Sequence, residues 1–183
     1  MAASEAAARE VLAHGGIVAY PTEAVYGLGC DPANAAAVER LLTLKGRDVR
    51  KGLILIAADI QGLSPWIAEP SAEVRARLDE TWPGPVTWLL PASSDCPVQV
   101  RGDHDTVAAR VTAHPVAADL CRAWGGALVS TSANRSGAAP ARDAAEVRRL
   151  FGDEIDLVIE GPLGGLDRPT PIRDARTGAT IRE

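Results

Sequence analysis

Segments with the periodicity of a helix and segments with that of a strand alternate along this chain from end to end. Residues 53–57 read Leu-Ile-Leu-Ile-Ala, an unbroken apolar run that is typical of a strand buried on both faces. Residues 34–44 instead place their apolar side chains at helical spacing. This interleaving predicts an α/β or α+β fold, in which helices flank a twisted sheet. Several successive strands have no helix between them, so we expect mixed parallel and antiparallel pairing.

Capping and turn residues set the expected boundaries of these elements. Gly15 and Gly16 should end the first helix, and Ser71 should cap the third. Asp143 and Glu146 should form a capping box at the start of the last helix. The expected helices cover residues 4–13, 34–44, 71–81, 115–124 and 144–151, and the expected strands cover 17–20, 53–57, 86–90, 106–111, 127–131 and 155–159, with a hairpin over 170–183. With 183 residues and no low-complexity linker, we expect a single domain over residues 1–183.

The composition argues against several classes of protein. The three cysteines form no CxxC pair, which argues against a disulfide framework or a structural zinc site. The formal net charge of −5 argues against the broadly basic surface that many nucleic-acid binders have. No run of about 18 apolar residues occurs, and the first residues lack the pattern of a signal peptide. We therefore expect a cytoplasmic protein with no membrane span.

Both lysines of the chain, Lys45 and Lys51, lie in one short segment, although the chain has 17 arginines. With Arg47 and Arg50 they place four cations between an expected helix and an expected buried strand. Arginine forms bidentate hydrogen bonds and lysine carries a movable charge, so this loop suits a triphosphate. It is neither a Walker A loop nor a Rossmann fingerprint. Cations that complement a helix dipole are the alternative explanation.

A cluster of short polar side chains follows the strand expected at 127–131. It includes Ser130, Ser132 and Asn134. Such a turn at a strand end can cradle phosphate oxygens, cap a helix or hold a nucleophilic serine. A serine nucleophile requires a histidine base and an acid, and the three histidines of the chain show no such arrangement. A hydrolase is therefore poorly supported.

Three further polar residues adjoin expected strands. Thr22 follows the first strand, where ligands bind in open α/β sheets, and Gly27 and Gly29 would allow close backbone approach. Thr87 follows a rigid Trp-Pro-Gly-Pro turn. For both threonines, a turn without chemistry is the alternative. Arg110 lies inside an apolar strand, where a charge must be paired or reach a ligand; we favour a substrate carboxylate or a phosphate, with a buried ion pair as the alternative.

Five motifs together resemble the YrdC/Sua5/TsaC family. They occur in the family's order and read YPTEAVYGLGCDP, LKGRDVRKGLILIA, WPGPVT, VAARVTAHP and LVSTSANRSG. The length and the tail IRDARTGATIRE are similar to the short bacterial TsaC form, and the resemblance covers about residues 10–182. It implies a twisted mixed α/β sheet around a large concave pocket.

The resemblance also implies an activity, that of a threonylcarbamoyl-AMP synthase. Such a nucleotidyltransferase joins L-threonine, bicarbonate or CO₂, and ATP into threonylcarbamoyl-adenylate and releases pyrophosphate. Mg²⁺ would be bound through ATP rather than by protein side chains. Downstream proteins of the TsaD/TsaB/TsaE type would then transfer the threonylcarbamoyl group to adenosine 37 of ANN-decoding tRNAs, giving t6A. Binding of tRNA or double-stranded RNA is a further expectation.

The family's motifs assign roles to particular residues of this sequence. The expected catalytic residues are Lys45 and Arg47. The expected ATP-binding residues are Lys45, Arg47, Lys51, Thr87, Ser130, Ser132, Asn134 and Arg182, of which Lys51 is assigned from charge and spacing. The expected threonine-binding residues are Thr22, Arg110 and Thr170. The sequence departs from the family pattern at Asp48, where a proline is usual, and in the tail, where GLDRPTPIRD replaces the usual S-T-V-x-D pattern.

Two other functions remain open from the sequence. One is carbamoyl-adenylate chemistry on another acceptor, as in a domain of hydrogenase-maturation proteins, although this chain lacks their acylphosphatase and zinc-finger segments. The other is an RNA-binding module without enzymatic activity. The negative net charge argues against that as the main role.

Overall fold

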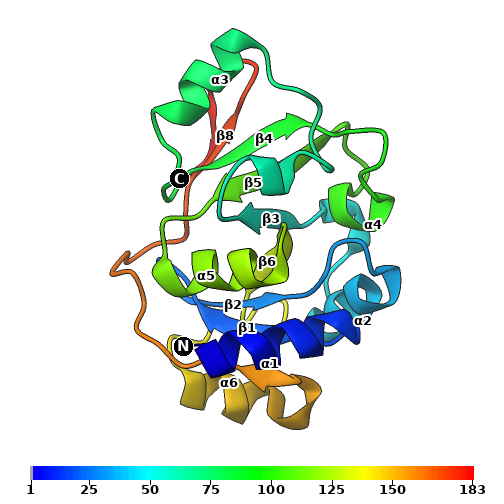
Figure 1. Ribbon diagram of the computed structural model, residues 1–183, viewed down its shortest axis with the longest axis vertical. Helices are drawn as coiled ribbons and strands as arrows, with labels where there is room; N and C mark the ends of the chain where they lie inside the picture. The colour runs from blue at the N-terminus through cyan, green and yellow to red at the C-terminus, as the bar shows by residue number, and fades with distance from the viewer. Residues whose placement is uncertain (1) are drawn as a thin grey trace.

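A computed structural model describes residues 2–183 of the chain, with side chains from residue 4 onward. Within this part of the chain, nine strands form one mixed sheet in the order β7-β1-β2-β6-β3-β5-β4-β8-β9 (Figure 1). The strands are β1 (Val18–Pro21), β2 (Tyr26–Gly29), β3 (Ile54–Ala57), β4 (Thr87–Pro91), β5 (Thr106–Val111), β6 (Leu128–Ser132), β7 (Leu157–Val158), β8 (Ile172–Asp174) and β9 (Thr180–Arg182). The helices are α1 (Ala2–Ala13), α2 (Ala35–Lys45), α3 (Ala72–Asp79), α4 (Val98–Arg101), α5 (Pro115–Trp124) and α6 (Ala144–Phe151), with 3-10 turns at η1 (Val49–Lys51), η2 (Gln61–Leu63) and η3 (Gly152–Glu154).

The strands pair in both directions, as the missing helical connections predicted. β3 pairs with β5 in parallel and with β6 in antiparallel. β1 pairs with β2 in antiparallel, and β2 pairs with β6 in antiparallel. β2 therefore connects β7 and β1 to the strands from β6 onward. No strand is expected from the sequence at β2, where Gly27 and Gly29 predict close backbone approach and a turn is the alternative. The predicted hairpin in the tail is confirmed as β8 and β9, which extend the sheet beside β4.

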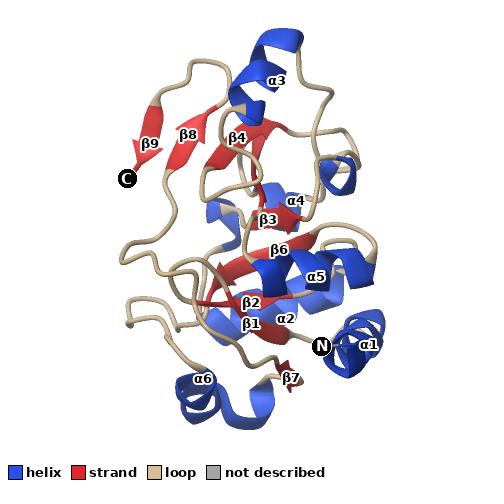
Figure 2. Cartoon of the chain, turned by 60° about the vertical axis from the view of Figure 1, so that its left-hand side comes forward, coloured by secondary structure: helices blue, strands red, loops and turns tan. Residues whose placement is uncertain are grey.

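Helices cover both faces of the sheet (Figures 1 and 2). On one face α1 and α5 pack against Val18 and Tyr20 of β1 and against Leu128 of β6. On the other face α2 and α6 pack against Ile17 and Ala19, the residues that alternate with Val18 and Tyr20. Burial on both faces explains the unbroken apolar run that predicted β3. None of the described helices is long and apolar enough to cross a membrane.

The boundaries of α2 set the position of the basic loop. The Asn34 side chain caps the helix by accepting a hydrogen bond of 3.1 Å from the Ala37 backbone nitrogen. The helix ends at Gly46, whose φ of 60° lies in the left-handed region that favours glycine. Lys45 is therefore the last helical residue, and Arg47 begins the loop that leads to β3. The predicted cap at Ser71 of α3 is also confirmed.

Gly29 allows the close approach of β1, β2 and β6, and this gives a testable prediction. A Cβ at this position would lie 2.5 Å from the Val129 carbonyl oxygen and 2.9 Å from the Tyr20 ring. We expect Gly29→Ala to lower the free energy of unfolding by about 1–3 kcal/mol, measured by urea denaturation. Gly126→Ala is the control, because a Cβ at Gly126 meets no atom within 4 Å. Equal stability of the two variants would contradict the packing described here.

Candidate active site

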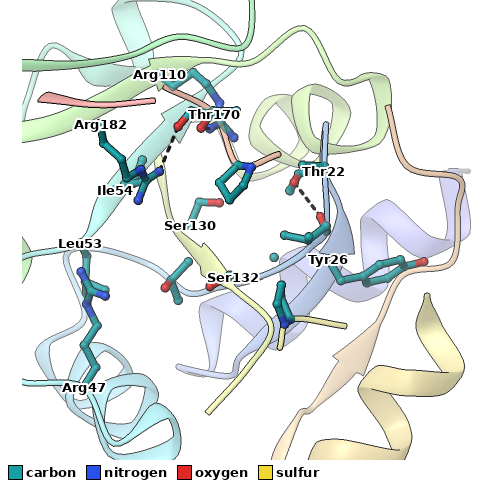
Figure 3. A pocket seen from close by; sticks show the side chains of 16 residues that line it. Thr22, Tyr26, Arg47, Leu53, Ile54, Arg110, Ser130, Ser132, Thr170 and Arg182 are labelled. Carbon is teal, nitrogen blue, oxygen red and sulfur yellow. Dashed lines mark hydrogen bonds between the residues drawn. The ribbon is translucent and has the colours of Figure 1, made fainter. Parts of the chain in front are cut away.

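A cavity of about 280 Å³ lies against the centre of the sheet and is bordered by the C-terminal tail (Figure 3). Its volume is close to the lower end of the range typical of small-molecule sites, roughly 300–1,000 Å³. The polar side chains that line it are Thr22, Tyr26, Arg47, Arg110, Ser130, Thr131, Ser132, Thr170 and Arg182. None of the described residues in this lining is acidic. The cavity therefore presents cations and hydroxyl groups to a ligand.

Three arginines from distant parts of the sequence face this cavity. Arg47 follows α2, Arg110 lies on β5 and Arg182 on β9, with Arg182 between the other two (Figure 3). Burial lowers the pKa of Arg47 from its ordinary value, and the charge of Arg182 lowers it further. Burial likewise lowers the pKa of Arg182, to which Arg110 contributes. Mutual repulsion between these cations disfavours the empty cavity, so an anionic ligand would stabilise it.

Arg47 is held in place by the backbone of its own loop. Its Nε and Nη2 atoms donate hydrogen bonds of 3.1 and 2.8 Å to the carbonyl oxygen of Gly52. Gly52 has a φ of 63°, and a Cβ there would lie 2.8 Å from the Arg101 carbonyl oxygen. The guanidinium is thus preoriented at one end of the cavity, away from Arg110 (Figure 3).

Arg110 forms an ion pair, which was one of the two explanations for a charge in this apolar strand, and it also borders the cavity. It forms a buried ion pair with Glu23, with Nη2 lying 3.1 Å from Oε2. Its Nη1 atom donates a hydrogen bond of 2.8 Å to the Thr170 hydroxyl. It also lines the cavity, although only 4% of the residue is exposed. The ion-pair alternative is therefore confirmed, and binding of a substrate carboxylate or a phosphate by Arg110 stays a prediction.

Lys45 lies beneath the hydroxyl-rich turn rather than in the cavity lining. Its Nζ donates to the carbonyl oxygens of Ser132 and Asn134, the latter at 2.8 Å, and to Asn134 Oδ1 at 3.2 Å. The Ser132 hydroxyl also donates to Asn134 Oδ1, at 2.6 Å. Burial lowers the pKa of Lys45 to about 8, and the charge of Arg47 contributes. One ammonium group thus fixes the shape of the turn that borders the cavity.

The other residues assigned from the sequence fall into two groups. Thr22, Ser130, Ser132, Thr170 and Arg182 line the cavity together with Arg47 and Arg110. Four others are outside the lining: Lys45 and Asn134 support the turn, Thr87 is fully buried behind Thr170, and Lys51 is exposed on η1. The structure therefore brings the two expected substrate regions together, without Lys51. The predicted roles of all these residues toward ATP and threonine stay predictions.

No role is predicted from the sequence for Tyr26 and Thr131, which line the cavity, or for Glu23, which lies behind it. Glu23 lies next to Thr22 in the first motif, yet its carboxylate is buried and contacts Arg110 on β5. An acidic residue in a segment rich in apolar residues is a signal that a buried partner exists. The described residues contain no group of three or more histidine, cysteine, aspartate or glutamate side chains placed to hold a metal ion.

This chain matches a known protein family. A model of the Sua5/YciO/YrdC family, described as "Telomere recombination", matches residues 10–183. The chain belongs to this family, as its five motifs predicted. A relative from Halorhodospira halophila (strain DSM 244 / SL1), named threonylcarbamoyl-AMP synthase, is 63% identical over 171 residues, which are 93% of this chain and 90% of the relative.

Solved structures agree with the family membership. The crystal structure of P. abyssi Sua5 complexed with L-threonine matches with a TM-score of 0.86 and 33% identity over 93% of this chain. The match covers 50% of that protein, so the present chain spans about half its length. The crystal structure of E. coli YciO matches with a TM-score of 0.84 and 27% identity, over 98% of this chain and 88% of YciO. These likenesses confirm the predicted mixed α/β fold.

Proposed function

We propose that this chain is a threonylcarbamoyl-AMP synthase, which forms threonylcarbamoyl-adenylate and pyrophosphate from L-threonine, bicarbonate or CO₂, and ATP. The observation that carries the proposal is the cavity lined by three arginines and several hydroxyl groups. The named relative and the threonine-bound Sua5 structure support it, and they agree with the activity that the sequence motifs predicted.

The reaction joins two anions, which explains the charge of the cavity. The amine of threonine takes up CO₂ and loses a proton to give a carbamate. A carbamate oxygen then attacks the α-phosphorus of ATP, and the bond from that phosphorus to the pyrophosphate oxygen breaks. Cations around the cavity offset the repulsion between the reactants and stabilise the charge that develops. No protein nucleophile is required, so positioning supplies much of the rate.

The two substrates would occupy different ends of the cavity. The threonine end is formed by Thr22, Arg110 and Thr170, which supply one cation and two hydroxyl groups. The nucleotide end contains Arg47, which lies away from Arg110 (Figure 3). The residues proposed to act on ATP are Lys45, Arg47, Thr87, Ser130, Ser132, Asn134 and Arg182, with Lys45 and Arg47 as the proposed catalytic pair. Lys51, which is exposed outside the lining, is left out of the proposal.

Mg²⁺ would enter with the nucleotide. The cavity lining among the described residues offers hydroxyl oxygens but no carboxylate, so the protein alone is a poor magnesium site. Phosphate oxygens of ATP are the ligands that would hold the ion, and the ion would then neutralise part of their charge. The protein's own contribution is to place Arg47 and the Ser132 turn beside those phosphates.

A pyrophosphate-release assay tests the proposed function. The full chain would be incubated with ATP, Mg²⁺ and bicarbonate, and each proteinogenic amino acid would be added in turn. We expect pyrophosphate only when threonine and bicarbonate are both present. Release that needs neither threonine nor bicarbonate, or release with every amino acid alike, would reject the proposal.

The lowered pKa of Lys45 predicts a pH dependence of ATP binding. Below pH 8 the side chain carries its proton, and above pH 8 it is mostly neutral, because the pKa is about 8 rather than the ordinary 10.5. If the cation supports phosphate binding, the dissociation constant for ATP should rise about tenfold between pH 7 and pH 9. Isothermal titration calorimetry would measure it. Lys45→Met, which cannot titrate, should bind ATP weakly at both pH values, and the same pH dependence in this variant would contradict the assignment.

The biological setting follows from the proposed product. We propose that the 183 residues act as one domain in the cytoplasm and that the product passes to proteins of the TsaD/TsaB/TsaE type, which transfer its threonylcarbamoyl group to adenosine 37 of ANN-decoding tRNAs. A mixed anhydride with phosphate is reactive toward water, so its acceptor chemistry must follow soon after its formation. Binding of tRNA by this chain is part of the same proposal.

A further inference from the structure

Glu23 is a buried carboxylate behind the cavity, and the reaction proposed above gives it no role. The residue is 6% exposed and is not part of the cavity lining. Both carboxylate oxygens are engaged: Oε2 accepts a hydrogen bond of 3.1 Å from Arg110 Nη2, and Oε1 accepts one of 2.7 Å from the Thr112 hydroxyl. Glu23 therefore does not contact a ligand in the cavity and can act on one only by its charge or by its hold on Arg110.

Thr112 holds Glu23 in one orientation. The Thr112 hydroxyl oxygen accepts a hydrogen bond of 3.1 Å from the backbone nitrogen of His114, which leaves its single hydrogen for Glu23. The Glu23 backbone is fixed as well, since its carbonyl oxygen accepts a hydrogen bond of 2.9 Å from the Leu166 nitrogen. A connected series of hydrogen bonds thus runs from the backbone before α5, through Thr112 and Glu23, to Arg110.

Arg110 keeps N–H donors that its protein partners do not fill, because a guanidinium carries five of them and each Nη carries two. Glu23 engages Nη2 and Thr170 engages Nη1, whereas the buried Nε has no hydrogen-bond partner among the described residues. Because Nε is buried, contact with a carboxylate in the cavity falls to the terminal Nη groups of Arg110. Because a guanidinium binds a carboxylate through a planar fork, small rotations of Arg110 would weaken such binding.

Glu23 can affect the binding of an anionic substrate in two ways that have opposite signs. If only its charge acted on the ligand, Glu23 would repel an anionic substrate, and neutralising it would strengthen binding. If its hydrogen bonds set the direction of the guanidinium, neutralising it would weaken binding. The engagement of both oxygens, and the anchoring of Thr112 by the backbone, favour the second effect.

We propose that Glu23 is a positioning residue that orients Arg110 toward the carboxylate of the amino-acid substrate, with Thr112 fixing Glu23 in turn. This inference rests on the function proposed above. It makes amino-acid binding, and not nucleotide binding, depend on two residues that do not touch the ligand. Neutralising Glu23 should therefore weaken threonine binding, whereas it would strengthen binding if Glu23 acted only by its charge.

The test compares Glu23→Gln and Thr112→Val with the wild-type chain. L-Threonine alone would be titrated by calorimetry, and the KM for threonine, the KM for ATP and kcat would follow from pyrophosphate release. We expect threonine binding to weaken by about tenfold or more in Glu23→Gln and by about threefold to tenfold in Thr112→Val. The KM for ATP should change by less than about twofold. Thr106→Val, the same substitution at the start of β5, is the matched control and should leave threonine binding unchanged.

The possible results are distinguishable. Unchanged or tighter threonine binding in Glu23→Gln would overturn the inference, as would equal losses for threonine and ATP, which would indicate a general structural role. If Glu23→Gln fails to fold, Thr112→Val decides, because it keeps the carboxylate and removes only one hydroxyl. If the wild-type chain binds no threonine and releases no pyrophosphate, the proposed function itself fails, and the inference fails with it.

Discussion

Replacing Lys45 by alanine is expected to lower kcat for pyrophosphate release by about 100-fold or more. The substitution removes the ammonium that binds the backbone carbonyls of Ser132 and Asn134, so the Asn134 carbonyl loses its donor among the described residues and the Ser132 carbonyl keeps only the Asn134 backbone nitrogen. It also removes a buried cation from the region where negative charge develops during the reaction. Loss of one preorganised group of this kind typically costs a factor of about 100 to 1,000 in kcat. Steady-state measurements at saturating substrates would show the effect.

Lys51 supplies the matched comparison, because it is the other lysine of the chain and lies six positions after Lys45, on η1. It is exposed and outside the cavity lining, so its charge is screened by solvent. We expect Lys51→Ala to change kcat by less than about threefold. A Lys45→Ala protein with the wild-type rate would contradict the catalytic role proposed for Lys45. A large effect of Lys51→Ala would instead support the role assigned to Lys51 from charge and spacing alone.

Replacing Arg47 by alanine is expected to lower kcat/KM for ATP by about 30-fold, as loss of a charge-assisted contact of about 2 kcal/mol implies. Arg47 is preoriented by two hydrogen bonds to the Gly52 carbonyl, so it loses little conformational freedom when a phosphate binds. The KM for threonine should change much less, because Arg47 lies away from Arg110 (Figure 3). Separate titrations of the two substrates would show this difference.

Two further variants control for charge and for geometry. Arg50→Ala removes another arginine of the same loop, whose exposed side chain pairs with Asp48 instead of facing the cavity. It should leave kcat/KM for ATP within about twofold, since exposed ion pairs contribute little. Arg47→Lys keeps the charge but loses the planar fork, so an intermediate loss is expected. Equal losses in Arg47→Ala and Arg50→Ala would indicate that only the net charge of the loop matters.

Most of the fold follows from local patterns in the sequence, but β2 and the short helix α4 were not predicted. The apolar run of β3, the helix before the basic loop and the tail hairpin were each predicted from residues within the element. β2 was not, because Tyr-Gly-Leu-Gly contains two glycines and has the composition of a turn. It is a strand because β1 and β6 lie close on its two sides, and Gly29 permits that approach. Such a cause lies in the tertiary structure and leaves no local signal.

The candidate site, like the fold, could be predicted only in part from the sequence. Clusters of cations and hydroxyl groups predicted which segments would meet, and Arg47, Arg110 and Arg182 do line one cavity. The direction of each side chain could not be predicted, because it depends on contacts between residues far apart in sequence. Lys45 supports the Ser132 turn from beneath, and Glu23 holds Arg110 across 87 positions of the chain. Both residues lie in the quoted motifs, but a motif does not show which distant residue a side chain contacts.

The most direct test of the proposed activity is the identity of the nucleotide product. The wild-type chain would be incubated with ATP, Mg²⁺, L-threonine and ¹³C-labelled bicarbonate, and the nucleotides would be analysed at once by mass spectrometry. The account predicts an adenylate that contains both threonine and one ¹³C atom, formed in equal amount with pyrophosphate. ADP and phosphate as the products, or an adenylate that contains threonine without the labelled carbon, would contradict it.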